Sequence, residues 1–216
     1  MKVKVLQNIL DANDQIANKN LKTLDRHKVL ALNIMSSPGA GKTSLILGTI
    51  AKLKGKVKIA VIEGDIASTI DADRISNEGV PVVQINTGGS CHLDANMLSN
   101  ALDSLELKDI ELLLIENVGN LVCPAEFRLG EHKRVALLSI PEGDDKPHKY
   151  PLMFTESEVI IINKIDLLPL LDFDFAAFRR AVTGLNPEVK LFQISSKTGE
   201  GFNEWISWLK AELRSL

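Results

Sequence analysis

Short apolar runs alternate with stretches of helical periodicity over most of the chain. Seven runs have the length and the branched aliphatic content of buried strands: LALNIM, KIAVIE, PVVQI, IELLLIE, VALLSI, EVIIIN and VKLFQIS. Helical stretches separate them, which predicts an α/β fold with three layers and a mostly parallel central sheet. Ahead of the first run, Val5, Ile9, Leu10 and Ile16 recur at helical spacing and predict an amphipathic N-terminal helix that covers one edge of the domain.

The order of the predicted elements also indicates where function lies. In sheets of parallel strands joined by right-handed crossovers, ligands bind at the carboxyl ends of the strands. Functional residues are therefore expected directly after the apolar runs. The least regular stretches, residues 119–133 and 141–151, are the two loops in which we expect them.

Composition and charge narrow the class of protein. The 216 residues are 45% hydrophobic and 25% charged, and interspersed charges leave a net charge of −3. This balance predicts neither a nucleic-acid nor a membrane partner. The first residues, MKVKVLQNILDANDQIANKN, interrupt their apolar positions with charges, unlike a signal peptide or a membrane span. We expect a cytoplasmic protein with a single domain over residues 1–216, on which the helical segment 1–27 packs.

One segment predicts phosphate binding. Residues 36–43, SSPGAGKT, follow a predicted strand and open a predicted helix, as a P-loop does. Backbone N–H groups of the small residues and the helix N-terminus bind phosphates, while Lys42 supplies a cation and the Thr43 hydroxyl binds Mg²⁺. Ser36 replaces the first glycine of the strict motif, and the alternative is a turn that only joins strand to helix. The predicted phosphate-binding residues are Gly39, Ala40, Gly41, Lys42, Thr43 and Ser44.

Two later loops predict that the nucleotide is GTP or GDP. The run EVIIIN continues into NKID, which resembles the NKxD element of GTPases. The Asp166 carboxylate can accept hydrogen bonds from guanine N1–H and from its exocyclic amine, a donor pair that adenine lacks. The last run continues into SSKT, similar to the SAK element that contacts the guanine oxygen. The predicted base-binding residues are Asn163, Lys164, Asp166, Ser195, Ser196 and Lys197.

Two strands end in acidic residues that are suited to Mg²⁺ and to hydrolysis. The sequence ENVG stands where GTPases usually carry Asp-x-x-Gly, so Glu116 and Gly119 are expected to sense the γ-phosphate. Another strand ends in EGD, and we assign to Asp65 the orientation of the attacking water. Each acid alone could equally be a helix cap. The predicted catalytic residues are Lys42, Asp65 and Glu116, and the predicted Mg²⁺ ligands are Thr43, Asp65 and Glu116.

A cysteine and histidine constellation accompanies these elements. Cys91 and His92 are adjacent in GGSCHLD, and Cys123 closely follows the ENVG segment. Thiolate and imidazole are the preferred protein ligands of Zn²⁺ and Ni²⁺, which makes these three residues a candidate metal site beside the γ-phosphate sensor. The alternatives are two buried free thiols with a surface histidine, or a disulfide formed on oxidation.

Several segments together resemble one known family. With SPGAGKT, EGD, TGGSCHLD, ENVGNLVCP and DKPHKYP in this order, the sequence resembles the HypB family, nickel-incorporation GTPases of [NiFe]-hydrogenase maturation. The resemblance implies a SIMIBI-class P-loop GTPase that dimerises with GTP and holds Ni²⁺ or Zn²⁺ at Cys91, His92 and Cys123 near the subunit interface. It implies that Lys149 reaches the partner's nucleotide. Other maturation proteins and the hydrogenase large subunit precursor are the implied partners.

Departures and alternatives accompany this resemblance. Some members carry a metal-binding N-terminal segment or a histidine where this sequence has Asn96, so nickel storage and a second metal are not expected. Asn120 stands where Ras-like GTPases carry a glutamine, which predicts slow hydrolysis. Urease-assembly GTPases share the nucleotide elements but carry a contiguous Cys-Pro-His run, and cobalamin-enzyme chaperones lack the thiol pair. A metal-responsive scaffold with incidental hydrolysis is the non-enzymatic alternative.

Overall fold

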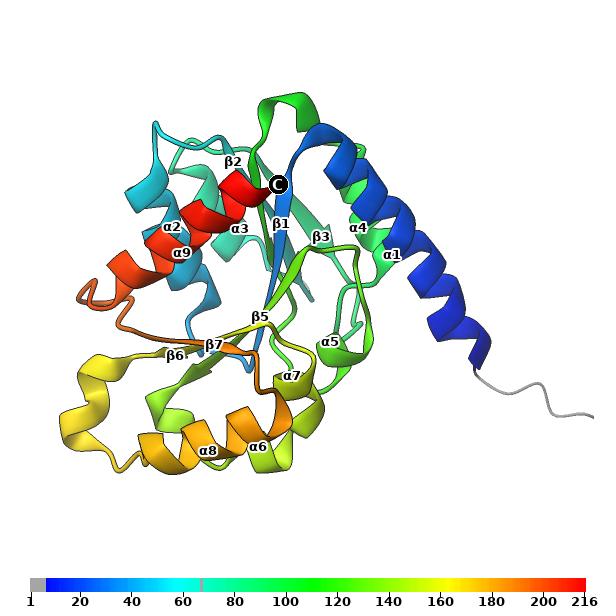
Figure 1. Cartoon of the computed structure of the whole chain (residues 1–216). Coiled ribbons are helices and arrows are strands. Elements are labelled where there is room, and N and C mark those ends of the chain that lie inside the picture. Colours follow the sequence, from blue (N-terminus) through cyan, green and yellow to red (C-terminus); the bar gives the residue numbers. More distant parts are fainter. Residues whose placement is uncertain (1–6, 67) are drawn as a thin grey trace, which may run out of the picture.

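A seven-stranded parallel sheet forms the centre of the molecule (Figure 1). The computed structural model describes residues 7–66 and 68–216, with side chains from residue 10 onward. The strands are β1 Leu30–Ser36, β2 Ile59–Asp65, β3 Val82–Asn86, β4 Leu112–Glu116, β5 Lys133–Ser139, β6 Val159–Asn163 and β7 Lys190–Ile194. All seven predicted runs are confirmed as strands. Their order across the sheet is β3-β2-β4-β1-β5-β6-β7, and every neighbouring pair is parallel.

Helices connect the strands and cover both faces of the sheet. The α-helices are α1 Gln7–His27, α2 Lys42–Leu53, α3 Ile70–Ser76, α4 Ala95–Leu102, α5 Cys123–Glu126, α6 Lys146–Lys149, α7 Pro151–Thr155, α8 Phe175–Leu185 and α9 Phe202–Ser215. Three 3₁₀ turns are η1 Leu107–Asp109, η2 Ile140–Glu142 and η3 Ile165–Leu170. Within the described part of the chain, no helix combines the length and the apolar character that a membrane crossing requires. The three-layer α/β architecture predicted from the sequence is confirmed.

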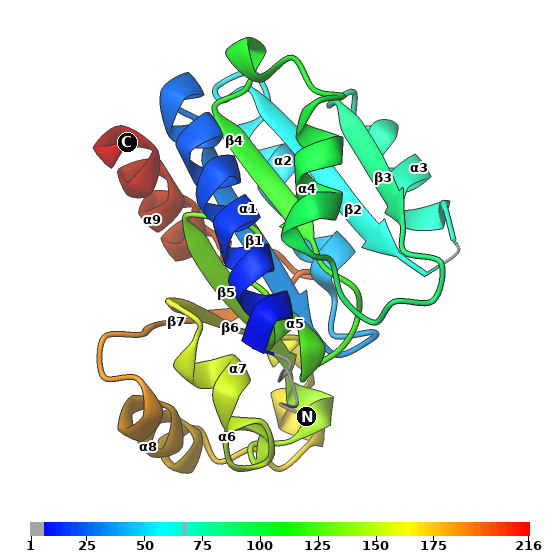
Figure 2. The same ribbon diagram turned by 90° about the vertical axis from the view of Figure 1, so that its right-hand side faces the viewer.

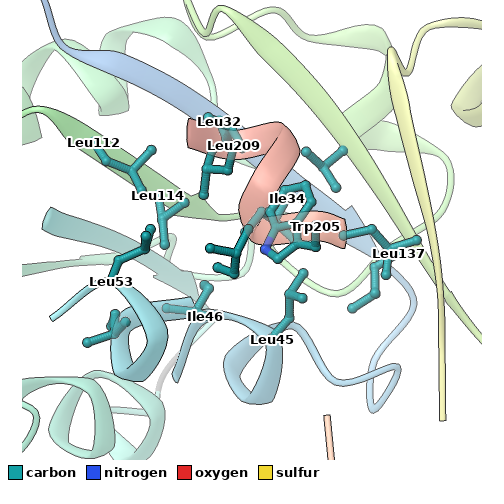
Figure 3. Close-up of a cluster of buried hydrophobic side chains, with 14 of the residues drawn as sticks. Leu32, Ile34, Leu45, Ile46, Leu53, Leu112, Leu114, Leu137, Trp205 and Leu209 are labelled. Atoms are coloured by element: carbon teal, nitrogen blue, oxygen red, sulfur yellow. The ribbon is translucent and has the colours of Figure 1, made fainter. Parts of the chain in front are cut away.

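One face of the sheet packs against α2 and α9. Alternate strand side chains such as Leu32 and Ile34 meet Leu45 and Ile46 of α2 and the fully buried Trp205 of α9 (Figure 3). Branched aliphatic side chains fit this pleated, closely packed surface, which explains why these runs form strands. The indole N–H of Trp205 donates to Thr49 Oγ1 at 3.0 Å, so the polar atom of the largest core side chain is paired.

The opposite face carries two clusters. Helices α1 and α4 cover β1, β2 and β4, whereas α7 and α8 cover β5 and β6 (Figure 2). Leu24 of α1 and Leu98 of α4 are fully buried in the first cluster, and Phe154 and Phe178 pack edge to face in the second. Together the two sides bury the sheet almost completely, which is typical of parallel sheets.

The predicted N-terminal helix exists, but its buried face differs from the predicted one. Leu10 is 43% exposed, and Val5 and the side chain of Ile9 lie outside the described residues. The buried face instead contains Asn13, Ala17, Asn20 and Leu24. Asn20 Nδ2 donates to the carbonyls of Ala95 and Leu129, each at 2.8 Å. Hydrophobic periodicity alone missed this face because two of its members are asparagines that hydrogen-bond to backbone.

The topology fixes the position of the site. After β1 the chain turns to β2 and β3, returns to β4, and then continues on the other side of β1 to β5. The direction of winding therefore reverses beside β1, and the loop after β1 lies at this switch point. Ligands bind there in open α/β sheets because adjacent loops diverge and leave a crevice.

Candidate nucleotide and metal site

The P-loop opens the larger of two neighbouring cavities. Gly41 has φ +107° and directly precedes α2, and an added Cβ would lie 2.4 Å from Asn163 Nδ2. Glycine is therefore required both by backbone conformation and by the close approach of the β6 loop. The cavity has a volume of about 500 Å³, and its lining includes Gly39, Lys42 and Thr43. Of the predicted phosphate-binding residues, all but the buried Ala40 line this cavity.

Lys42 is held ready for an anion. Its side chain is buried, and Nζ donates to Ser36 Oγ at 3.2 Å. Burial lowers the pKa of Lys42, and the carboxyl of Glu116 is the strongest opposing influence. A phosphate beside Nζ would favour the charged ammonium and offset the cost of its burial. Ser36, which replaces the motif's first glycine, therefore serves as a hydrogen-bond partner of the lysine.

The predicted Mg²⁺ ligands also meet at this cavity. Thr43 Oγ1 donates to Glu116 Oε1 at 2.9 Å, and Asp65 lines the same space. Glu116 Oε2 is buried and has no hydrogen-bond partner among the described residues. A hydroxyl, a carboxylate with a spare oxygen and a second carboxylate are a donor set that suits Mg²⁺. Asp65 Oδ1 accepts from the backbone N–H of Ser68 at 2.8 Å, which orients that carboxyl.

A third acid, Glu63, lines the cavity and was not predicted as a site residue. Its side chain is 2% exposed and lies beside Glu116 in the register of β2 and β4. Burial, with Glu116 and Asp65 nearby, raises the pKa of Glu63 to about 8. Burial also raises the pKa of Glu116 to about 7, against the influence of Lys42 and Thr43. The available signal was an acid inside an apolar run, two residues before Asp65 and so on the same side of the strand.

A second cavity of about 320 Å³ adjoins the first and is lined by five of the six predicted base-binding residues, whereas Ser195 is fully buried. Its lining includes Asn163, Lys164, Asp166, Ser196 and Lys197. Gly41 and Ser44 line both cavities, so a nucleotide can extend from one to the other.

Hydrogen bonds join the predicted base-binding loops to each other and to the P-loop. Ser195 Oγ donates to Asp166 Oδ1 at 2.6 Å, which orients the carboxylate expected to bind guanine. Asn163 Nδ2 donates to Ala40 O at 3.0 Å, and its Oδ1 accepts from the backbone and the hydroxyl of Ser196. Lys164 Nζ donates to Gly39 O at 2.7 Å. These bonds fix the positions of the loops relative to one another, and such preorganisation lowers the entropic cost of binding a ligand.

The three metal-ligand candidates come together. Cys91, His92 and Cys123 offer donor atoms that all lie within 4.8 Å of one another. The two Sγ atoms are 2.9 Å apart, and both cysteines are free thiols. Cys91 follows β3 by a short loop, whereas Cys123 is the first residue of α5, so the fold joins residues that are distant in sequence. Two thiols and one imidazole suit Zn²⁺ or Ni²⁺ and leave coordination positions open.

Neighbouring groups shape this cluster. The His92 ring stacks on Phe127, with ring centroids 4.0 Å apart. Burial lowers the pKa of His92, although Asp94 and Glu126 oppose the shift, and this favours the neutral imidazole that binds metals. A hydrogen bond with Cys91 raises the pKa of the Cys123 thiol. Phe127 gave no sequence signal because only the fold brings it to His92.

Residues 116–123 connect the two sites. Glu116 lines the larger cavity, and an added Cβ on Gly119 would lie 3.0 Å from Pro38 of the P-loop. Asn120 donates its backbone N–H to Ser36 O at 2.8 Å, and its side-chain amide lies 3.5 Å from Cys123 Sγ. The segment that contacts the P-loop therefore also contacts a candidate metal ligand.

Two residues singled out in the sequence lie elsewhere. Lys149 is exposed on α6, forms an ion pair with Asp145, and is not among the residues that line the two cavities. Its expected contact with a partner's nucleotide stays a prediction. Asn96 is exposed at the start of α4, outside the Cys91–His92–Cys123 group.

Known proteins resemble this chain over most of its length. Residues 30–193 match the family model described as CobW/HypB/UreG, nucleotide-binding domain. The hydrogenase maturation factor HypB of Escherichia coli (strain K12) is 48% identical over 204 residues, covering 94% of this chain and 70% of that protein. A probable hydrogenase maturation factor HypB of Methanocaldococcus jannaschii is 42% identical, with 98% and 96% covered.

Solved structures give the same picture. HypB from Helicobacter pylori in complex with nickel is 39% identical with a TM-score of 0.90, covering 94% of this chain and 96% of that one. HypB from Archaeoglobus fulgidus is 41% identical with a TM-score of 0.88, covering 94% and 100%. The signal recognition particle receptor FtsY from Elizabethkingia anophelis, at 18% identity and a TM-score of 0.54, shares the fold alone. The predicted SIMIBI-class P-loop architecture is confirmed.

Proposed function

The chain belongs to the CobW/HypB/UreG family, and from this premise we propose that it is a GTP-hydrolysing switch that delivers nickel during [NiFe]-hydrogenase maturation. The relatives from Escherichia coli and Methanocaldococcus jannaschii, which are named as HypB hydrogenase maturation factors, support this proposal. The observation that carries the proposal is the segment 116–123. It extends from the Mg²⁺ end of the nucleotide cavity to Cys123 of the thiol-imidazole cluster. A nucleotide-dependent movement of this segment would act on a metal ligand directly.

GTP is the proposed nucleotide, and different residues of this chain bind its base, bind its phosphates and support its hydrolysis. Asp166, oriented by Ser195, selects guanine, while Lys42 and the start of α2 hold the phosphates. Bound Mg²⁺ neutralises developing charge on the phosphates. Thr43 and Glu116 are placed to hold that ion, and Asp65 orients the attacking water. Hydrolysis is slow because Asn120, which bonds to the P-loop carbonyl of Ser36, stands in place of a water-positioning glutamine.

Nickel is the proposed cargo, bound by Cys91, His92 and Cys123. The geometry of two thiols and an imidazole also suits Zn²⁺, so the preference for nickel rests on the HypB relatives and on the nickel complex of the Helicobacter pylori protein. With three ligands from one chain, further positions stay open for water or for the acceptor. Such an open site suits a metal that must be released.

The proposal extends to assembly and setting. GTP stabilises a homodimer in which Lys149 reaches the nucleotide of the partner subunit, and the metal lies near the interface. The partners of the switch are the other maturation proteins and the hydrogenase large subunit precursor. The protein acts in the cytoplasm. The exposed position of Lys149, away from this chain's own cavities, leaves its ammonium accessible to a second subunit.

Nickel titration calorimetry tests the proposal. Ni²⁺ is added to the reduced protein loaded with GDP or with a non-hydrolysable GTP analogue. We expect one Ni²⁺ per protomer and an affinity that differs between the two states. His92→Ala and Cys123→Ser should weaken binding, whereas His148→Ala, which removes an exposed histidine outside the cluster, should not. Equal affinities in both states would refute equilibrium coupling at this site.

A scaffold in which hydrolysis is incidental is the second candidate, because none of the three residues of the thiol-imidazole cluster lines either nucleotide cavity. Asp65→Ala distinguishes the two. If the variant cannot hydrolyse GTP and cells that carry it fail to mature hydrogenase, the switch is supported. Normal maturation without hydrolysis would favour the scaffold.

A further inference from the structure

A chain of buried polar side chains runs beneath the two sites. Its members are Asn117, Asn33, Glu131 and Arg134, and none is more than 7% exposed. Buried polar groups carry a large desolvation cost unless all of them are paired, so such a chain calls for an explanation beyond packing. Asn117 directly follows Glu116, the proposed Mg²⁺ ligand, which places one end of this buried chain at the nucleotide cavity.

Asn117 also holds the segment that carries two metal-ligand candidates. Its Oδ1 accepts from the backbone N–H of Leu93 at 3.1 Å and from that of Val118 at 2.9 Å. Leu93 immediately follows His92. The Leu93 side chain in turn packs against Gly64 of β2, where an added Cβ would lie 2.7 Å from its Cδ2. Gly64 lies between Glu63 and Asp65 of β2. Through Leu93, the His92 segment therefore contacts the end of β2 and, at Asn117, the end of β4.

The remaining members lead to the segment that carries Cys123. Asn117 Nδ2 donates to Asn33 Oδ1 at 3.1 Å, and Asn33 Nδ2 donates to Glu131 Oε1 at 3.3 Å. Arg134 Nε donates to the same Glu131 oxygen at 2.7 Å. Arg134 Nη1 then donates to the carbonyl of Ala125 at 3.0 Å, within the short helix that Cys123 begins.

Glu131 fixes the orientation of the two asparagine amides in this chain. Its Oε2 accepts from the backbone N–H groups of Leu129 and Gly130, at 2.7 and 2.9 Å, so both carboxylate oxygens are occupied as acceptors. Asn33 must therefore present its NH₂ to Glu131 and its oxygen to Asn117. Asn117 in turn must present its oxygen to Leu93. Glu131 thus orients the Asn117 amide that holds the His92 segment, and Arg134 joins Glu131 to the helix that Cys123 begins.

We propose that Asn117, Asn33, Glu131 and Arg134 are positioning residues that couple the nucleotide state at Glu116 to the geometry of Cys91, His92 and Cys123. This inference rests on the proposed function, since it supplies the route of the nucleotide-dependent metal affinity. A shift of Glu116 with the γ-phosphate moves Asn117, whose bonds carry the shift to Leu93 and, through Asn33 and Arg134, to Ala125. The metal ligands on both segments then move together rather than singly.

The test measures coupling rather than binding alone. For each variant, the Ni²⁺ dissociation constant is measured with GDP and with a non-hydrolysable GTP analogue, and the ratio of the two constants is the coupling factor. Asn33→Leu cuts the middle of the chain with a side chain of similar volume. Arg134→Lys keeps the charge but removes the fork that joins Glu131 to Ala125. Neither residue lines a cavity or offers a metal ligand.

A matched control separates coupling from general destabilisation. Thr49→Val leaves the buried indole N–H of Trp205 without its partner, on the α2 and α9 face of the sheet and outside the Asn117–Arg134 chain. All variants are compared by thermal unfolding. In a double variant, Asn33→Leu with Arg134→Lys, the two changes interrupt one chain and should reduce the coupling factor no further than either alone.

The outcomes are distinct. We expect the coupling factor of Asn33→Leu and of Arg134→Lys to fall at least about fivefold toward one, since allosteric factors are typically about 5–150-fold. Stoichiometry should stay unchanged, and Thr49→Val should keep the wild-type factor. A wild-type factor in both chain variants overturns the inference while the proposed function stands. A factor of one in the wild type refutes the coupling in the proposed function, and the inference falls with it.

Discussion

The carboxyl pair of Glu63 and Glu116 makes the stability of the nucleotide-free protein depend on pH, and Glu63→Gln tests this. Burial, together with Glu116 and Asp65, raises the pKa of Glu63 from 4.5 to about 8. Between these values the folded chain holds a proton on Glu63 that the unfolded chain has released. The free energy of unfolding therefore falls as pH rises through this window and levels off above it.

The size of this pH effect on stability follows from the difference between the pKa of Glu63 in the folded and in the unfolded chain. Each pKa unit corresponds to about 1.4 kcal/mol, so Glu63 weakens the fold by roughly 3 kcal/mol at pH 7 relative to pH 4.5. Glutamine has similar volume and cannot ionise. In the variant, the free energy of unfolding should therefore fall less steeply with pH, by up to about 1.4 kcal/mol per pH unit. Glu116, whose pKa is raised to about 7, leaves a residual slope in the same direction.

The assay is urea unfolding of nucleotide-free, Mg²⁺-free protein at several pH values between 5 and 8.5, with wild type, Glu63→Gln and the control Glu106→Gln. Glu106 has a side chain that is 81% exposed and pairs with Lys108 on the surface, so its removal should leave the slope unchanged. Parallel curves for wild type and Glu63→Gln would refute the reasoning, because they would show that Glu63 titrates alike in the folded and unfolded chains.

Three further predictions concern other parts of the molecule. Asp166→Asn should weaken GTP binding by about 1.5–3 kcal/mol, the usual contribution of charge-assisted hydrogen bonds. It should improve binding of xanthosine triphosphate, because the carbonyl of that base can accept a hydrogen bond from the new amide. Competition assays with both nucleotides test these expectations. Gly201→Ala should destabilise the fold more than Gly199→Ala in chemical unfolding: both have positive φ, but an added Cβ would lie 1.8 Å from Gln193 O only at Gly201. Asn20→Ala should cost about 1–3 kcal/mol because it removes two buried hydrogen bonds, to the carbonyls of Ala95 and Leu129. One cooperative transition in the same experiment would support the prediction that residues 1–216 form a single unit.

The exposed face of α1 illustrates a limit of periodicity. The spacing of Val5, Ile9, Leu10 and Ile16 predicts an amphipathic helix. The helix exists, yet Leu10 is exposed and the buried face contains Asn13 and Asn20. Hydropathy assigns asparagine to the surface because its amide is well solvated there. Here backbone carbonyls and N–H groups of distant segments replace water as partners, and those segments are adjacent only in the folded chain.

By itself the sequence determined the elements whose signals are local. Buried parallel strands need continuous aliphatic runs, a P-loop needs its glycines and lysine at fixed spacing, and guanine selection needs an aspartate directly after a strand. It therefore specified the seven strands, and it indicated the loops proposed to bind phosphate and base and the three metal-ligand candidates. Only the tertiary structure decided that Glu63 faces Glu116, that Phe127 stacks on His92, and that Asn117, Asn33, Glu131 and Arg134 form one chain. Those relations depend on strand order and register, which bring side chains from separate segments within hydrogen-bond distance and leave no periodic trace in the sequence.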